Sequence, residues 1–230
     1  METTVIINDI QIPFQDRAVV SLVLHFINEL QPDRIILNGD VVDCYSLSTF
    51  TKDPMMAADI AREIGEAGEL MRDLYPARER IWLGGNHEFR LERYLWRQAP
   101  ELCGLEGLDF PELFHLDHYG FSWLPYGKIY RLGKLVITHG DTVRIHSGQT
   151  ARAHFEKFGE SVLIGHTHRM GAYYRTQLGK PHVAYENGCL CNLEPEYVNN
   201  PDWQQGFSVV YHEPETGEFY VQQIPIFRRG

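Results

Sequence analysis

The sequence lacks long hydrophobic runs, a basic leader and an excess of positive charge. No stretch approaches the roughly 18 apolar residues of a membrane-spanning helix. The first ten residues have neither the basic start nor the apolar centre of a secretory signal. The 21 Lys and Arg residues are outnumbered by 31 Asp and Glu, so the net charge is −10 with histidine neutral. An acidic chain repels bulk nucleic acid, except where bound divalent cations cancel the charge locally.

Cysteine is also scarce, with four in 230 residues. Their positions match neither a CxxC pair nor a disulfide-dense scaffold, and the separation of Cys189 and Cys191 is wrong for a zinc pair. We therefore expect structural cysteines and a reducing, cytoplasmic location. With 43% hydrophobic and 23% charged residues, the composition is that of a folded soluble protein. The length fits one α/β domain spanning residues 1–230.

Short β-branched runs alternate with helical patterns in the first half of the chain. Strands are predicted over residues 4–7, 34–37 and 80–83, and helices over 15–30 and 55–75. This order predicts a parallel sheet with right-handed crossovers. Further strands are predicted over 128–130, 134–138 and 161–164, with an antiparallel hairpin over 207–212 and 218–224. Strand direction should therefore become mixed towards the C-terminus.

Five of these apolar strands end in Asp, Asn or His, in most cases beside a glycine. Ligands of open α/β sheets collect at the carboxyl ends of strands, and glycine lets the backbone turn sharply there. The side chains expected to converge are Asp9, Asp40, Asn86, His139, His166 and His168, with Gln11, Asp43 and His87 beside them. Carboxylate, imidazole and amide groups can bind one or two divalent cations. A cation pair that shares a carboxylate activates water and clamps the oxygens of a phosphate ester, so the set predicts metal-dependent hydrolysis of such an ester.

The order of these blocks resembles that of the calcineurin-like metallophosphoesterases. The matching tracts, from residue 5 to about 170, are Asp9-Ile10-Gln11, GDVVD at 39–43, GNHE at 85–88, His139 and GHTH at 165–168. Each block is weak alone, but all five occur in order. The tracts DIQIPF and GNHEFRLERYLWRQAPEL resemble a small bacterial and phage-borne branch of the family. The resemblance implies a four-layer αββα sandwich with two mixed β-sheets.

The resemblance also implies which residues hold the metals. Asp9 and His168 would bind the first metal, and Asp40 would bridge the two. The residues that would complete the second metal site are Asn86, His139 and His166.

His87 resembles the family's histidine that contacts the scissile phosphate and protonates the leaving group. An imidazole beside two cations and a phosphate can supply a proton near neutral pH, so His87 and Asp40 are the expected catalytic residues. Asp43 is expected to orient a neighbouring ligand instead of binding metal, and Glu88 to orient His87.

Gln11 departs from the family pattern, because the first motif usually ends in histidine. An amide oxygen is a neutral, hard ligand that suits Mg²⁺, Mn²⁺ or Ca²⁺ better than Zn²⁺. Gln11 could therefore ligate weakly and favour Mn²⁺, or it could leave the first site half-empty. We favour the first alternative and expect two divalent ions, with Mn²⁺ preferred over Mg²⁺, Fe, Zn²⁺ or Ni²⁺.

Some residues near the motifs are weaker candidates for contact with the substrate phosphate. Three arginines follow the GNHE block at helical spacing, namely Arg90, Arg93 and Arg97. The favoured reading pairs this stripe with acids such as Glu92 or Glu101, and the alternative places Arg90 or Arg93 on the substrate. His146 follows His139 closely enough to reach the phosphate as well.

The substrate class is the open part of the prediction. A phosphodiesterase acting on nucleotides or small diesters is the first expectation, and a DNA or RNA nuclease is the second. The negative charge counts against tight duplex binding. A phosphoprotein phosphatase comes third. A non-catalytic metal-binding scaffold has only Gln11 in its favour. A small phosphate ester or nucleotide is thus the expected partner, with nucleic acid possible as substrate and no membrane contact.

Overall fold

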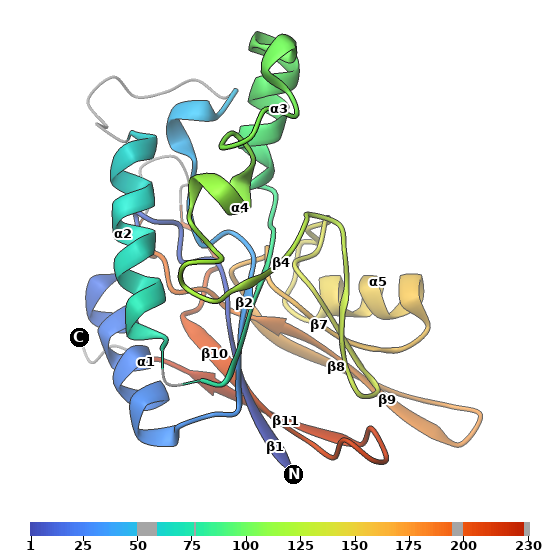
Figure 1. Ribbon diagram of the computed structural model, residues 1–230. Helices are drawn as coiled ribbons and strands as arrows, with labels where there is room; N and C mark the ends of the chain where they lie inside the picture. The colour runs from blue at the N-terminus through green and yellow to red at the C-terminus, as the bar shows by residue number, and fades with distance from the viewer. Residues whose placement is uncertain (50–58, 76, 195–199, 228–230) are drawn as a thin grey trace.

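Two β-sheets pack face to face between layers of helices (Figure 1). A computed structural model of the protein describes residues 1–49, 59–75, 77–194 and 200–227. The first sheet has the strand order β11 (Phe219–Pro225), β10 (Gly206–His212), β1 (Glu2–Ile7), β2 (Arg34–Asn38), β3 (Glu79–Leu83) and β4 (Ser122–Leu124). The second sheet has the order β5 (Tyr130–Leu132), β6 (Leu135–Thr138), β7 (Ser161–Ile164), β9 (Lys180–Asn187) and β8 (Met170–Gln177).

Strand direction changes along the chain as predicted. The strands β1, β2, β3 and β4 are parallel neighbours. The hairpin of β10 and β11 is antiparallel and joins the sheet through β1. In the second sheet β6, β7 and β9 are parallel, while β5 and β8 are antiparallel strands at the two edges. Both sheets are therefore mixed.

Helices cover the outer faces of both sheets. The helices α1 (Arg17–Leu30) and α2 (Ile60–Asp73) lie on the first sheet, and α5 (Gln149–Phe158) lies on the second (Figure 1). At the top of Figure 1, beyond the strands, lie α3 (Phe89–Gln98) and α4 (Phe110–Leu113). Two short 3₁₀ turns, η1 (Tyr45–Leu47) and η2 (Pro100–Leu102), complete the described elements. This arrangement confirms the four-layer αββα sandwich. No helix in the described part of the chain is long and apolar enough to cross a membrane.

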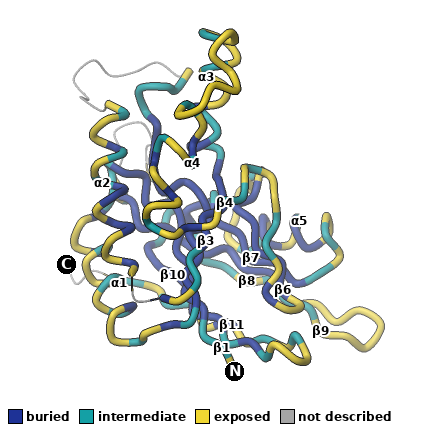
Figure 2. The backbone as a smooth tube through the Cα atoms, viewed as in Figure 1, coloured by how far each residue is buried: buried dark blue, intermediate teal, exposed yellow. Residues whose placement is uncertain are grey.

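Alternation of side chains along each strand produces the four layers. Val5 and Ile7 belong to the buried cluster shared with α1 and α2, whereas Ile6 between them packs against the second sheet. In β7, Leu163 faces the first sheet and Val162 packs with α5. Successive strand residues point to opposite faces, so a strand covered on both faces is apolar throughout. Figure 2 shows these strands as the buried centre of the molecule.

Aspartate caps explain where the two main helices begin. Asp16 accepts hydrogen bonds from two backbone N–H groups at the start of α1, and Asp59 accepts one at the start of α2. The helix predicted over 55–75 is observed as Ile60–Asp73. The predicted residues 55–58 lie outside the described part of the chain.

The sequence patterns missed the hairpin of β8 and β9, the edge strand β4 and the helix α5. Most of β8 is exposed or half-buried, so it carries none of the apolar alternation that marks a strand with one buried face. Likewise, α5 buries two of its polar residues, Thr150 and His154, on the same face as Ala151 and Phe155. The formation of β8 and α5 therefore depends on tertiary packing and not on a local sequence pattern.

Candidate metal centre

The strand-end loops of the two sheets meet at one edge of the sandwich. Backbone hydrogen bonds tie the loop after β1 to the loop after β2, from Asp9 N to Gly39 O (3.0 Å) and from Gln11 N to Asp40 O (3.0 Å). In the loop after β7, the backbone N–H of His166 donates to Oδ2 of Asp9 (2.8 Å). Residues that are far apart in the sequence therefore share one site.

Asp9, Gln11 and His168 form what we call the first half-centre. Oδ1 of Asp9 lies 3.1 Å from Nε2 of His168, and Nε2 of Gln11 lies 3.1 Å from the same ring nitrogen. Asp9 is fully buried, and its Oδ1 faces the ring nitrogen of His168. A carboxylate oxygen and an imidazole nitrogen are both ligand atoms for divalent ions, so a cation beside Oδ1 fits this group. A half-turn of the Gln11 amide would add Oε1 as a third donor.

The second half-centre consists of Asp40, Asn86, His139 and His166. Nε2 of His139 lies 3.3 Å from Oδ1 of Asp40 and 3.2 Å from Oδ1 of Asn86. The ligand atoms of Asp40, His139 and His166 all lie within 4.8 Å of one another. Carboxylate and amide oxygens beside imidazole nitrogens are a donor set for a divalent first-row metal ion. The residues present therefore fit a metal in this half as well.

Five of the seven candidate ligands are held in an unfavourable backbone conformation. Ten described residues other than glycine have a positive φ. Half of them are candidate ligands: Asp9, Gln11, Asp40, His166 and His168. Such a conformation costs free energy for any residue with a Cβ and persists where the surrounding structure enforces it, often at functional sites. The strain is thus concentrated at the metal centre.

Two motif glycines let the ligands approach one another. A Cβ on Gly39, which has a φ of +84°, would come within 2.6 Å of Cγ of His139. A Cβ on Gly85 would overlap the Asp40 carboxylate and come within 2.5 Å of its backbone nitrogen. Any side chain at either position would push a candidate ligand away.

The carboxylates and imidazoles of the centre strongly shift each other's protonation. Although burial lowers it, the adjacent Asp40 carboxylate raises the pKa of His139 to about 10. Burial likewise lowers the pKa of His168, but Asp9 raises it to about 10. Burial and the charge of His139 together lower the pKa of His166 to about 4. Burial opposes ionisation of Asp40, yet His139 and His87 hold its pKa well below the usual value. A cation that takes the place of these protons would meet ionised carboxylates.

His87 sits between two carboxylates and an arginine. Its Nδ1 lies 3.2 Å from Oδ2 of Asp43 and its Nε2 lies 3.5 Å from Oδ2 of Asp40. Arg90 donates from Nη1 to both the side chain and the backbone oxygen of Asp43 (2.7 Å each), and its Nη2 lies 3.0 Å from Nε2 of His87. Asp43 thus touches His87 and Arg90. Among the described residues, Arg90 forms its ion pair with Asp43 and not with the acids Glu92 or Glu101.

Glu88 does not orient His87, contrary to the sequence-based expectation. Its buried carboxylate accepts hydrogen bonds from the backbone N–H groups of Gly85 (2.7 Å), Asp40 (2.9 Å) and Val41 (2.7 Å). Glu88 therefore connects the loop after β2, which holds Asp40, to the loop after β3, which holds Gly85, through their backbone N–H groups. Burial and the nearby Asp40 charge raise the pKa of Glu88.

Two of the weaker substrate candidates lie apart from the cluster. Arg93 and His146 are exposed, and no hydrogen bond or ion pair within the described ranges joins either side chain to a candidate ligand. Their part in substrate binding stays a prediction.

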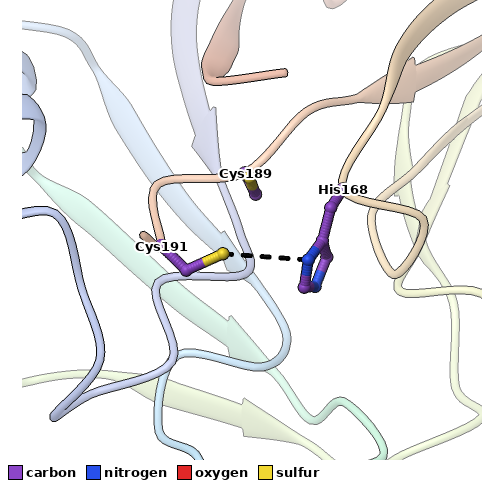
Figure 3. A group of neighbouring side chains, drawn as sticks. All are labelled: His168, Cys189 and Cys191. Atoms are coloured by element: carbon purple, nitrogen blue, oxygen red, sulfur yellow. Dashed lines mark hydrogen bonds between the residues drawn. The ribbon is translucent and has the colours of Figure 1, made fainter. Parts of the chain in front are cut away.

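Sequence reasoning did not identify the residues that surround the ligand histidines. Nδ1 of His139 lies 2.8 Å from the backbone oxygen of Asn38, and Nδ1 of His168 lies 3.7 Å from Sγ of Cys191 (Figure 3). The ring of Trp203 packs edge-on against His168 at a centroid distance of 4.2 Å. The sequence feature that could have indicated these neighbours was the Cys189-Leu190-Cys191 tract, whose spacing does not match that of a zinc-binding cysteine pair.

Comparison with known proteins places this centre in context. The sequence pattern of one protein family, described as calcineurin-like phosphoesterase, matches residues 3–170. The gene 54 protein of Mycobacterium phage D29 is 32% identical over 233 residues, covering 90% of this chain and 87% of the phage protein. The gene 54 protein of Mycobacterium phage L5 is 32% identical over 234 residues, with the same coverage.

Solved structures show a more distant likeness. Wild-type Vps29 of Entamoeba histolytica, in complex with Zn²⁺, is 13% identical with a TM-score of 0.48, covering 97% of this chain and 98% of that one. The phosphoesterase YfcE of E. coli is 14% identical with a TM-score of 0.44, covering 98% of this chain and 100% of that one. The family match and the phage relatives carry the assignment, because these structural likenesses are too weak to do so.

Proposed function

The chain belongs to the calcineurin-like phosphoesterase family, and we propose that it is a metal-dependent phosphodiesterase acting on nucleotides or other small phosphodiesters. The family supports hydrolysis of a phosphate ester with divalent metal. The dinuclear centre, the preference for Mn²⁺ and the choice of diesters belong to the proposal.

One observation carries the proposal: the Asp40 carboxylate lies beside the ligands of the second half-centre and beside His87, in a loop that is bonded to the loop of the first half-centre. Asp40 lies 3.3 Å from His139 of the second half-centre and 3.5 Å from His87, and the backbone of its loop is bonded to that of Gln11. This arrangement suits a bridging carboxylate between two cations. Asp9, Gln11 and His168 would hold one cation, and Asn86, His139 and His166 the other.

Two bound cations would supply Lewis-acid activation of water and neutralise the charge of the phosphoryl group. The protein's own side chains would orient the proton donor beside these cations. Nδ1 of His87 lies 3.2 Å from the Asp43 carboxylate, and Nε2 faces both Asp40 and Nη2 of Arg90. From this position a protonated Nε2 would give its proton to the leaving oxygen. Arg90 in turn fixes Asp43 through two hydrogen bonds.

The test is hydrolysis of bis-p-nitrophenyl phosphate and p-nitrophenyl phosphate by metal-stripped protein resupplied with Mn²⁺, Mg²⁺ or Zn²⁺. We expect Mn²⁺-dependent turnover that favours the diester. His87→Ala should lower the rate by about 10²–10⁴-fold, the usual contribution of a general acid, and should still bind two ions. His118→Ala, a change of a histidine outside the centre, is the matched control and should keep full activity.

The same assay distinguishes the alternatives. Turnover of the monoester alone would contradict the diesterase proposal. Cleavage of DNA or RNA that falls steeply with added salt would indicate a nuclease, because phosphate contacts along a nucleic acid are salt-sensitive. A folded protein that binds two ions and turns over no phosphate ester would indicate a scaffold.

A further inference from the structure

Two buried thiols and a ring nitrogen form a cluster behind the first half-centre. Cys189 and Cys191 follow β9, and His168 follows β7. Nδ1 of His168 faces the thiol of Cys191 at 3.7 Å, and the ligand atoms of all three residues lie within 4.8 Å of one another (Figure 3). Both cysteines are fully buried, and His168 is 6% exposed.

The environment of His168 differs from that of His139, another candidate ligand. A histidine that binds metal usually donates its outer N–H to a carbonyl or carboxylate oxygen, as His139 can do to the backbone oxygen of Asn38. A neutral thiol is a weak hydrogen-bond partner. Orientation of His168 is therefore a poor explanation for two adjacent thiols.

We propose that Cys189, Cys191 and Nδ1 of His168 form a binding site for a thiophilic divalent cation such as Zn²⁺ or Cd²⁺. Thiolate and imidazole are the preferred donors of these ions. Zn–S and Zn–N bonds of about 2.3 and 2.0 Å place sulfur and nitrogen about 3.5 Å apart in a tetrahedral site, close to the 3.7 Å observed between Cys191 and His168. The oxygen-rich half-centres lack any sulfur donor.

The site shares His168 with the first half-centre, so the two compete. A neutral imidazole has one nitrogen lone pair available and carries a proton on the other nitrogen. His168 can therefore serve the Asp9 side through Nε2 or the thiol side through Nδ1. Binding at the thiol side releases two thiol protons to solvent. A thiophilic cation would thus weaken the first half-centre, a consequence that rests on the proposed function, whereas the binding itself does not.

Titration of metal-stripped protein with Co²⁺ or Cd²⁺ tests the site directly. Metal–thiolate coordination gives an intense ultraviolet charge-transfer band, which oxygen and nitrogen ligands do not produce. We expect this band in the wild-type protein, and its loss in Cys189→Ser and Cys191→Ser with at least about a tenfold fall in Cd²⁺ affinity. Cys44→Ser, a buried thiol elsewhere, and Cys103→Ser, an exposed one, are the matched controls and should keep the band.

Two further measurements separate this proposal from folding effects and from the catalytic proposal. Asp40→Asn, which damages the dinuclear centre, should keep the band. X-ray absorption of the wild-type protein loaded with Zn²⁺ should show sulfur among the scatterers and needs no variant. Absence of sulfur scatterers and of the band in the wild-type protein would overturn the proposal, as would a band that disappears in Cys44→Ser or Cys103→Ser.

Discussion

The two half-centres are built from the same kind of strand-end loop but are anchored differently. In the second, His139 faces a backbone oxygen on β2, which cannot move without the sheet. In the first, His168 faces a thiol, and a glutamine replaces the histidine of the family motif. The second half-centre is thus tied to the backbone of the sheet through His139, and the first half-centre is tied to a side chain through His168.

Asp40→Asn should have the largest effect, since Asp40 is the residue that we propose to bridge the two metals. We expect activity to fall by about 10³-fold or more, the scale seen when a group that stabilises transition-state charge is removed, and both metals to bind more weakly. Asp141→Asn is the matched control, because Asp141 is exposed and pairs with Lys157. Activity assays and metal analysis measure both. Loss of only one metal would show that the halves are independent.

Gly85→Ala should damage the second half-centre from the backbone side. The new methyl group would overlap the Asp40 carboxylate, so we expect the free energy of unfolding to fall by about 1–3 kcal/mol. Gly65→Ala in α2 is the control, because a Cβ there meets nothing within 4 Å. It should raise stability by up to about 1 kcal/mol. Urea denaturation compares them, and equal stability of the two variants would refute the close-approach argument.

Metal-free protein should lose stability as the pH rises. The folded-state pKa of His139 is about 10 against an ordinary value of 6.5, so its protonated form stabilises the fold fully below pH 6.5. This contribution is lost as the pH rises towards 10. His168, with a pKa of about 10, behaves alike. Metal-loaded protein should lose less, because its ligand imidazoles carry no such proton.

Thermal melts across this range, with and without Mn²⁺, measure the effect. Burial raises the pKa of Glu63 to about 8, which lowers stability over part of the same range in both forms. The difference between the two forms is therefore the quantity to compare. If stability depended on pH in the same way with and without metal, the idea that metal replaces the protons of these histidines would be wrong. His139→Gln should make the stability of the metal-free protein depend less on pH.

Gln11 variants should have the smallest effect and should act on the first half-centre alone. Gln11→Ala should weaken one metal by about tenfold, and Gln11→His should shift the preference from Mn²⁺ towards Zn²⁺. Metal competition titrations measure both. Unchanged stoichiometry and Mn²⁺ dependence in Gln11→Ala would show that Gln11 is not a ligand.

Much of the sandwich was predictable, because strands buried on both faces carry continuous apolar runs. The runs at 34–37 and 161–164 are observed as β2 and β7. The missed β8 is an edge strand with mostly exposed side chains, which local patterns cannot separate from a loop. Convergence of the strand-end polar residues was also predictable from the parallel order, and the structure places them together.

The sequence by itself determined the family and the layer order, because these follow from local patterns and ordered motifs. It also named the residues that we propose as metal ligands. Only the tertiary structure decided how each ligand is held. It assigned Glu88 to backbone N–H groups instead of His87 and Arg90 to Asp43. It also brought Cys191 to His168. Most of these contacts join segments outside the strands that are far apart in the sequence, so they depend on chain packing that no local pattern records.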